Sequence, residues 1–218
     1  MKKLLNGNEA LAYGAIAYGL DIFAGYPITP STDIYEVLEV ELEKYGGKFL
    51  HAESEISAIN MVMGAYAAGK RAMTCTSGCG FSLMQETISY MAADFCPAVI
   101  VNVMREGAGL GDIKRSQGDY WQMTKGGGNG DYRSIVISCE SIEDCMNAPK
   151  NAFYLAEKYR NPVIITYDSD IAHTKESVEL LDLTKIEKIS NLEYAITGNK
   201  NGLHKVFQNV YYHEKNYD

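Results

Sequence analysis

The 218-residue sequence has little of what several protein classes need. It has no long apolar run: the longest strongly apolar stretch, residues 97–104, is far shorter than the roughly 20 residues of a membrane-spanning helix. It has no excess of Lys and Arg, because the formal net charge is −8. Nucleic-acid binding requires clustered basic side chains. The sequence therefore predicts a soluble protein that uses neither a membrane nor a nucleic acid.

Cysteine is also scarce, and its spacing closes no metal site. The five cysteines stand at positions 75, 79, 96, 139 and 145. The first two form a CxxxC pair, but the next cysteine is too distant to complete a zinc or iron–sulfur set. Polar residues at positions 6–9 interrupt the apolar segment that a signal peptide needs. We expect reduced thiols and a cytoplasmic protein.

Nucleotide-binding motifs are missing as well. Residues 107–112 and 126–131 are rich in glycine, but in each an aspartate stands where a dinucleotide fingerprint has its third glycine. Neither segment is the first strand-to-helix turn of the chain, and no GxxxxGK followed by Ser or Thr is present. An NAD-dependent enzyme is therefore the weakest of the functional alternatives.

What the sequence does contain is a regular alternation of two patterns. Short apolar runs typical of strands occur at residues 21–25, 48–52, 71–76, 97–104, 133–139 and 161–167. Helical spacing of apolar residues occurs at 8–20, 31–45, 54–69, 80–95 and 141–160. Strands separated by helices of this length form crossover connections. The sequence predicts an α/β fold with a six-stranded, mainly parallel sheet and helices on both faces.

Ligands in such folds bind at the carboxyl ends of the strands, so the residues after each strand are of interest. They include Thr29 within GYPITPST, the pair Glu53 and Glu55, the segment 76–80, and Arg105. Each has an ordinary structural explanation. The prolines can stiffen a turn, a glutamate at a helix start contributes about 0.3–1 kcal/mol, and an arginine can form a surface ion pair. Together, however, they favour a site for a small anionic molecule.

Four segments carry a family resemblance: GNEALAYGAI, FAGYPITPST, ESEISAINMVMGAYAAGKRAMTCTSG and GFSLMQE. They resemble the α chain of 2-oxoacid:ferredoxin oxidoreductases, in the domain that binds the aminopyrimidine of thiamine diphosphate. Residues 116–133, SQGDYWQMTKGGGNGDYR, are most similar to the 3-methyl-2-oxobutanoate (2-ketoisovalerate) branch and less similar to the 2-oxoglutarate branch. The resemblance implies a pyrimidine-binding domain at residues 1–190. It implies a linker or docking tail at 191–218, with the usual second domain absent.

The resemblance also implies roles for individual residues. Glu55 matches the catalytic carboxylate that faces the N1′ atom of the aminopyrimidine. The family pattern places this carboxylate nine residues before Gly64, so Glu55 fits and Glu53, near the same helix start, does not. Thr29 and Arg105 match the residues that bind the substrate carboxylate. Pro27, Ile28 and Thr29 would line the cofactor beside Glu55, and the prolines around Thr29 would hold it still.

Further components are implied on other chains. The sequence has no GDG followed by a distant asparagine, so Mg²⁺ and the diphosphate are expected on a β chain. The 4Fe–4S clusters are expected on an iron–sulfur chain, with ferredoxin as electron acceptor and coenzyme A as second substrate. The isolated chain is then expected to be inactive. A non-catalytic remnant or regulatory subunit stays an alternative, although it would have no use for Glu55, Thr29 and Arg105 together. Cys79 departs from the proline that many relatives carry.

Overall fold

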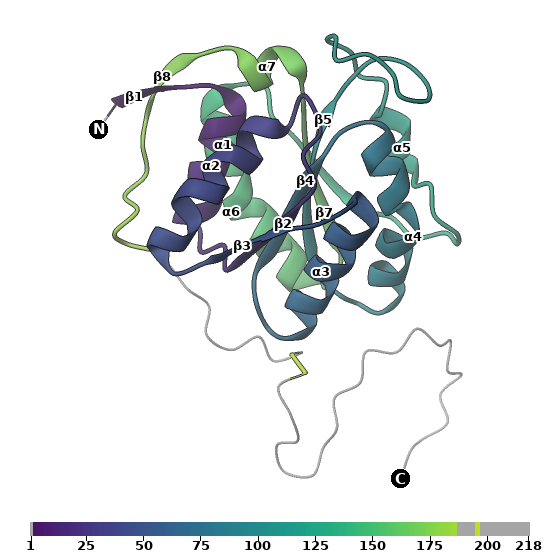
Figure 1. Ribbon diagram of the computed structural model, residues 1–218. Coiled ribbons are helices and arrows are strands. Elements are labelled where there is room, and N and C mark those ends of the chain that lie inside the picture. Colours follow the sequence, from purple (N-terminus) through teal and green to yellow (C-terminus); the bar gives the residue numbers. More distant parts are fainter. Residues whose placement is uncertain (1, 187–194, 197–218) are drawn as a thin grey trace, which may run out of the picture.

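The computed structural model describes residues 2–186, 195 and 196. Its centre is a six-stranded sheet in the order β3-β2-β4-β5-β7-β6, with every neighbouring pair parallel (Figure 1). The strands are β2 (Ile22–Gly25), β3 (Lys48–His51), β4 (Ala72–Thr76), β5 (Ala98–Met104), β6 (Ile135–Ser138) and β7 (Pro162–Asp168). The predicted fold class and the six parallel strands are confirmed.

Helices cover both faces of this sheet, and two apolar cores result. The helices are α1 (Gly7–Ala17), α2 (Thr32–Glu41), α3 (Glu55–Ala67), α4 (Cys79–Ala93), α5 (Tyr120–Lys125) and α6 (Ile142–Tyr159). One core joins α1, α2 and α6 to the sheet, and the other joins α3 and α4 to it (Figure 1). In β5, Val99 and Val101 belong to the first core and Ile100 to the second. Because strand side chains alternate between faces, a strand buried on both sides is apolar throughout.

Several short elements were not predicted. β1 (Lys2–Leu5) pairs antiparallel with β8 (Glu176–Glu179) in a separate two-stranded sheet. The helices α5 and α7 (Ser169–His173) also lie where no helix was expected. The expected helix 31–45 is divided, because α2 continues as a 3₁₀ turn, η1 (Leu42–Tyr45). All of these elements are too short for a periodic pattern to reveal them.

The expected tail at residues 191–218 lies outside the described residues, apart from Ala195 and Ile196. Ala195 is buried, and the Ile196 N–H donates to the Ala67 carbonyl at 2.7 Å, at the end of α3. Within the described part of the chain, no helix is long and apolar enough to cross a membrane.

Helices α1 and α6 touch through their backbones. A Cβ atom at Gly14 would lie 2.0 Å from the carbonyl oxygen of Met146, which is backbone and has little freedom to move. At Gly64, in the middle of α3, a Cβ atom would meet nothing within 4 Å. These two helical glycines are therefore a matched pair, one required by packing and one not.

We expect Gly14→Ala to reduce the free energy of unfolding by about 1–3 kcal/mol, because α1 must move away from α6. Gly64→Ala should raise it by about 0.5–1 kcal/mol, because alanine has the better helix propensity. Urea denaturation of the two variants measures both changes. Equal stabilities of the two variants would contradict the close approach of α1 and α6.

Candidate active site

The carboxyl ends of the strands bring the predicted site residues to one edge of the sheet. Glu55 is the first residue of α3, which begins just after β3, and its N-cap Ser54 accepts a hydrogen bond from the Ser57 N–H. Glu55 is only 5% exposed. Glu53 is exposed instead and accepts a hydrogen bond from the Ser57 hydroxyl at 2.9 Å. The two glutamates at this helix start therefore lie in different environments, and only Glu55 is part of the interior.

The Glu55 carboxylate lies against the start of α4. A Cβ atom at Gly80, the second residue of α4, would be 2.4 Å from Glu55 Oε1. Any larger residue at position 80 would displace the carboxylate. Gly78, the N-cap of α4, has a φ of 48°, which favours glycine. Within the segment TSGCG, Gly78 thus permits the turn, and Gly80 lets the Glu55 carboxylate pack against the start of α4.

Arg105 follows β5 and is only 6% exposed. Its Nη1 donates to the Thr29 carbonyl at 2.8 Å, and its Nη2 donates to Cys79 Sγ at 3.3 Å and to the Leu110 carbonyl. Its Nε is buried and has no hydrogen-bond partner in the described part of the structure. Arg105 and Thr29 are thus in direct contact, through the Thr29 carbonyl, while the Thr29 residue itself is exposed.

The loop that carries Thr29 is held by hydrogen bonds to buried polar side chains of the core. The peptide between Thr29 and Pro30 is cis, and the Pro30 carbonyl accepts a hydrogen bond from Asn8 Nδ2 at 2.7 Å. Asn8 Oδ1 in turn accepts from the Tyr167 hydroxyl at 2.8 Å. Burial raises the pKa of Tyr167 well above its ordinary value, so this hydroxyl stays a neutral donor. Pro27 is exposed at the tip of the loop.

Ser31 adds a bond within this loop. Its hydroxyl donates to the Ile28 carbonyl at 2.8 Å, and the Ile28 side chain is half-buried. Ser31 is the N-cap of α2 but makes no capping hydrogen bond to the helix with its side chain. The hydroxyl of this serine therefore shapes the loop rather than the helix start.

Asp119 is a site residue that the sequence did not identify. It is 6% exposed, and its Oδ2 accepts hydrogen bonds from the Gly78 N–H and from Asn102 Nδ2, each at 3.1 Å. Asp119 therefore ties the long segment after β5 to the turn that begins α4. Its position in SQGDYW carries no local signal for burial, because the neighbouring residues are polar or exposed.

The same edge contains buried polar atoms that have no hydrogen-bond partner in the described part of the structure. They are Thr76 Oγ1, Ser77 Oγ, Asn102 Oδ1 and Arg105 Nε. Buried polar atoms in folded proteins nearly always have a hydrogen-bond partner. Several such atoms at the edge that carries Glu55 favour a polar ligand there as a further partner.

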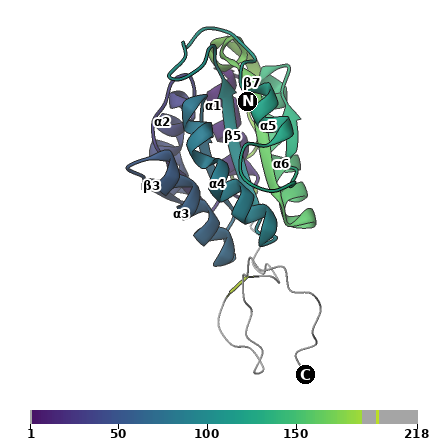
Figure 2. The same cartoon turned by 90° about the vertical axis from the view of Figure 1, so that its right-hand side faces the viewer.

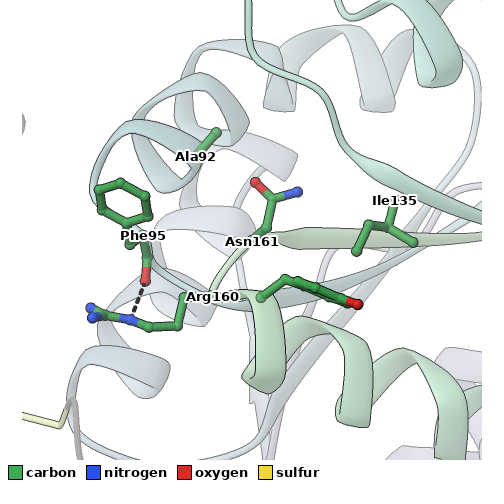
Figure 3. Close-up of a pocket in the computed structure, with 6 residues that line it drawn as sticks. Ala92, Phe95, Ile135, Arg160 and Asn161 are labelled. Atoms are coloured by element: carbon green, nitrogen blue, oxygen red, sulfur yellow. Dashed lines mark hydrogen bonds between the residues drawn. The ribbon is translucent and has the colours of Figure 1, made fainter.

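A hollow lies at the opposite edge of the sheet, where β5, β6 and β7 begin. Its volume is about 470 Å³, and its lining residues are Ala92, Phe95, Ile135, Tyr159, Arg160 and Asn161 (Figure 3). Arg160 Nε donates to the Phe95 carbonyl across it at 3.0 Å. This hollow is lined by no carboxylate and is separated from Glu55 by the length of the strands, so it is not the candidate site.

Comparisons with known proteins agree on one family. Residues 13–210 match the family described as "Pyruvate flavodoxin/ferredoxin oxidoreductase, thiamine diP-bdg". The chain is 42% identical to ketoisovalerate oxidoreductase subunit VorB of Methanothermobacter thermautotrophicus over 96% of its own length and 59% of the relative. It is 45% identical to 2-oxoglutarate synthase subunit KorA of the same organism over 84% of its length and 49% of the relative. The chain thus spans about half to three fifths of these relatives.

A solved structure gives the same result. The chain superposes on 2-oxoglutarate:ferredoxin oxidoreductase from Magnetococcus marinus, solved with 2-oxoglutarate, coenzyme A and succinyl-CoA bound. The TM-score is 0.82 at 36% sequence identity, over 86% of this chain and 33% of the other. The likeness therefore extends to nearly all of the described fold.

Cys79 should be the single reactive thiol of the folded chain. It is partly exposed beside Arg105, whereas the other four cysteines are buried. Burial raises the pKa of Cys75 and of Cys96 to about 12, so neither of these two should become a reactive thiolate when the pH is raised from 8 to 9.5. We expect a disulfide reagent to titrate one thiol per chain, and none in Cys79→Ser. A second rapidly reacting thiol without denaturant would contradict this burial pattern.

Proposed function

Because the chain belongs to the family of thiamine diphosphate-binding domains of pyruvate flavodoxin/ferredoxin oxidoreductases, we propose that it forms the aminopyrimidine side of an oxidoreductase active site. The proposed reaction is oxidative decarboxylation of a 2-oxoacid to an acyl-CoA, with electrons passed to ferredoxin. One observation carries the proposal: the buried Glu55 carboxylate lies at the carboxyl edge of the sheet, against Gly80 in the first turn of α4.

The site suits an aminopyrimidine. A ring nitrogen of this heterocycle needs a carboxylate beside it, and the buried Glu55 carboxylate lies against Gly80 at the carboxyl edge of the sheet. The heterocycle also carries hydrogen-bond donors and acceptors, and the unsatisfied hydroxyl of Ser77 lies at the same helix start. The chemistry of the residues present therefore fits the group.

Thiamine diphosphate, when bound, supplies a nucleophilic carbon that adds to the substrate carbonyl and then holds the electron pair left by carbon dioxide. Glu55 would hold and return a proton at the ring nitrogen N1′ through its carboxylate. Its burial excludes water, which would otherwise compete for that hydrogen bond. The starts of α3 and α4 both point toward this carboxylate, and helix N-termini favour negative charge.

Arg105 would attract the substrate carboxylate. A guanidinium is always charged and has five donors, of which Nε has no partner in the described residues. Nη1 fixes the loop of Thr29, so the exposed Thr29 side chain is held near the same position. Pro27 and Ile28 would line the cofactor from the same loop.

Other parts of the enzyme are proposed to lie on partner chains. Among the described residues, no group of three His, Cys, Asp or Glu side chains has a metal-binding arrangement. We place Mg²⁺ and the diphosphate on a β chain and the 4Fe–4S clusters on an iron–sulfur chain.

We propose 3-methyl-2-oxobutanoate as the substrate, with 2-oxoglutarate as the second candidate. A substrate with two carboxylates needs a second cation at the site. On the loop after β5, Lys114 pairs with Asp112, and Arg115 pairs with Asp168 and Asp170. These pairings favour a substrate with an apolar side chain. Ratios of kcat/KM for the two acids in the assembled complex decide between them.

Glu55→Gln should slow removal of the cofactor C2 proton by about 10²–10⁴-fold in the assembled complex, because an amide cannot take up the proton. Glu53→Gln is the matched control, since Glu53 is exposed and bonded only to Ser57. Hydrogen–deuterium exchange at C2, followed by NMR, measures this step directly. A larger effect of Glu53→Gln would transfer the role to Glu53. No effect of either substitution would favour the non-catalytic subunit.

The isolated chain should bind thiamine diphosphate and Mg²⁺ far more weakly than the assembled complex does. The reason is that the proposed diphosphate contacts lie on another chain. Isothermal titration calorimetry of the chain, with and without the candidate β chain, measures the difference. Equal affinities in the two titrations would overturn the division of the site between chains.

A further inference from the structure

Two threonines of β4 have buried hydroxyls without partners. Thr74 and Thr76 are both 0% exposed, and the Oγ1 atom of each has no hydrogen bond in the described part of the structure. They are two positions apart on one strand and therefore point to the same face of the sheet. That face is the one covered by α3 and α4, which lie side by side in Figure 2. The two residues share their burial and orientation, but only Thr76 stands at the carboxyl edge.

Thr76 and Glu55 border the same small space. A Cβ atom at Gly80 would lie 2.2 Å from Thr76 Oγ1 and 2.4 Å from Glu55 Oε1. Both oxygens therefore occupy positions that a side chain at residue 80 would overlap, and they lie close to each other across Gly80. Small rotations about the side-chain bonds of the two residues bring them into hydrogen-bond contact.

We infer that Thr76 is a positioning residue, whose hydroxyl donates a hydrogen bond to the Glu55 carboxylate and orients it toward the ligand. The inference rests on the proposed function, in which Glu55 is the carboxylate that meets the aminopyrimidine. A carboxylate has two oxygens with about four acceptor positions. A bond from Thr76 to one oxygen would leave the other to face the ring nitrogen. The Thr76 hydroxyl, which has no partner in the described structure, would then have Glu55 as its acceptor.

A purely structural role does not account for the hydroxyl of Thr76. Valine has nearly the same shape and the same branching at Cβ, so it would fill the volume without burying an unsatisfied polar atom. Thr74 shows the same mismatch away from the site and is therefore the matched control. If shape alone mattered, valine would be tolerated equally at both positions.

The first experiment requires no cofactor. In chain labelled with ¹³C at the glutamate Cδ, the Glu55 resonance is the one that disappears in Glu55→Gln. At neutral pH we expect this resonance to move in Thr76→Val. It should keep its wild-type position in Thr76→Ser, which retains a hydroxyl, and in Thr74→Val. An unchanged resonance in Thr76→Val would overturn the proposed hydrogen bond.

The second experiment uses the assembled complex and the exchange of the cofactor C2 proton. Thr76→Val should slow exchange about tenfold, the usual effect of losing one hydrogen bond to a charged group. Its effect on kcat should exceed its effect on the KM of the 2-oxoacid. Thr76→Ser and Thr74→Val should exchange at the wild-type rate. If Thr76→Val does not fold, Thr76→Ala takes its place, because alanine also lacks the hydroxyl and adds no atoms.

The two proposals fail in different ways. If Glu55→Gln slows exchange but Thr76→Val does not, Glu55 keeps its role and the role of Thr76 is refuted. If Glu55→Gln has no effect on exchange, the proposed function fails, and the Cδ resonance still decides whether Thr76 bonds to Glu55. If Thr74→Val slows exchange as much as Thr76→Val does, a general loss of β4 packing explains both, and the inference is wrong.

Discussion

The contact between the Glu55 carboxylate and Gly80 is the constraint on which the site depends. It joins the first residue of α3 to the first turn of α4, and it exists only because position 80 has no side chain. The carboxylate is buried, yet it lies at the positive ends of two helices, which offset part of its desolvation. The parallel sheet makes this arrangement possible, since β3 and β4 deliver both helices to the same edge.

Loops at that edge are held by hydrogen bonds to buried side chains. Asn8, which accepts a hydrogen bond from Tyr167, donates to the Pro30 carbonyl and so fixes the loop of Thr29. Asp119 fixes the turn at Gly78, and Arg105 joins that turn to the Thr29 loop from the side. Each connection joins segments far apart in the sequence and buries the group that makes it. The result is a site whose positions are set by the sheet and its helices, although its residues lie in loops.

The sequence predicted those parts of the fold that repeat and missed those that depend on single tertiary contacts. PAVIVNVM and NPVIITY indicated buried parallel strands because they are nearly continuous apolar runs, and β5 and β7 confirm them. The family resemblance is likewise confirmed by the match over residues 13–210. The pairing of β1 with β8 was not predictable, because four-residue strands at distant positions carry no periodic signal.

The candidate site shows the same division. The sequence placed Glu55, Thr29 and Arg105 at one edge, because all three follow strands of one parallel sheet. It did not reveal that the Thr29 carbonyl, rather than its hydroxyl, meets Arg105. It also gave no sign of Asp119, because burial of an aspartate beside Gly78 is decided by how a distant loop folds.

The edge that carries the site is also where the fold accepts features that reduce stability. Gly78 has a left-handed φ, Gly80 packs directly against a buried carboxylate, and the hydroxyls of Thr76 and Ser77 are buried without partners in the described structure. Each costs free energy that the two apolar cores must offset. At the opposite end of the sheet, Arg71 and Glu157 form a buried pair with bonds of 2.5 and 3.0 Å. The Arg71 guanidinium is thus paired within the protein, whereas Ser77 Oγ and Arg105 Nε, at the edge that carries Glu55, have no partner in the described structure. This contrast favours a ligand at that edge.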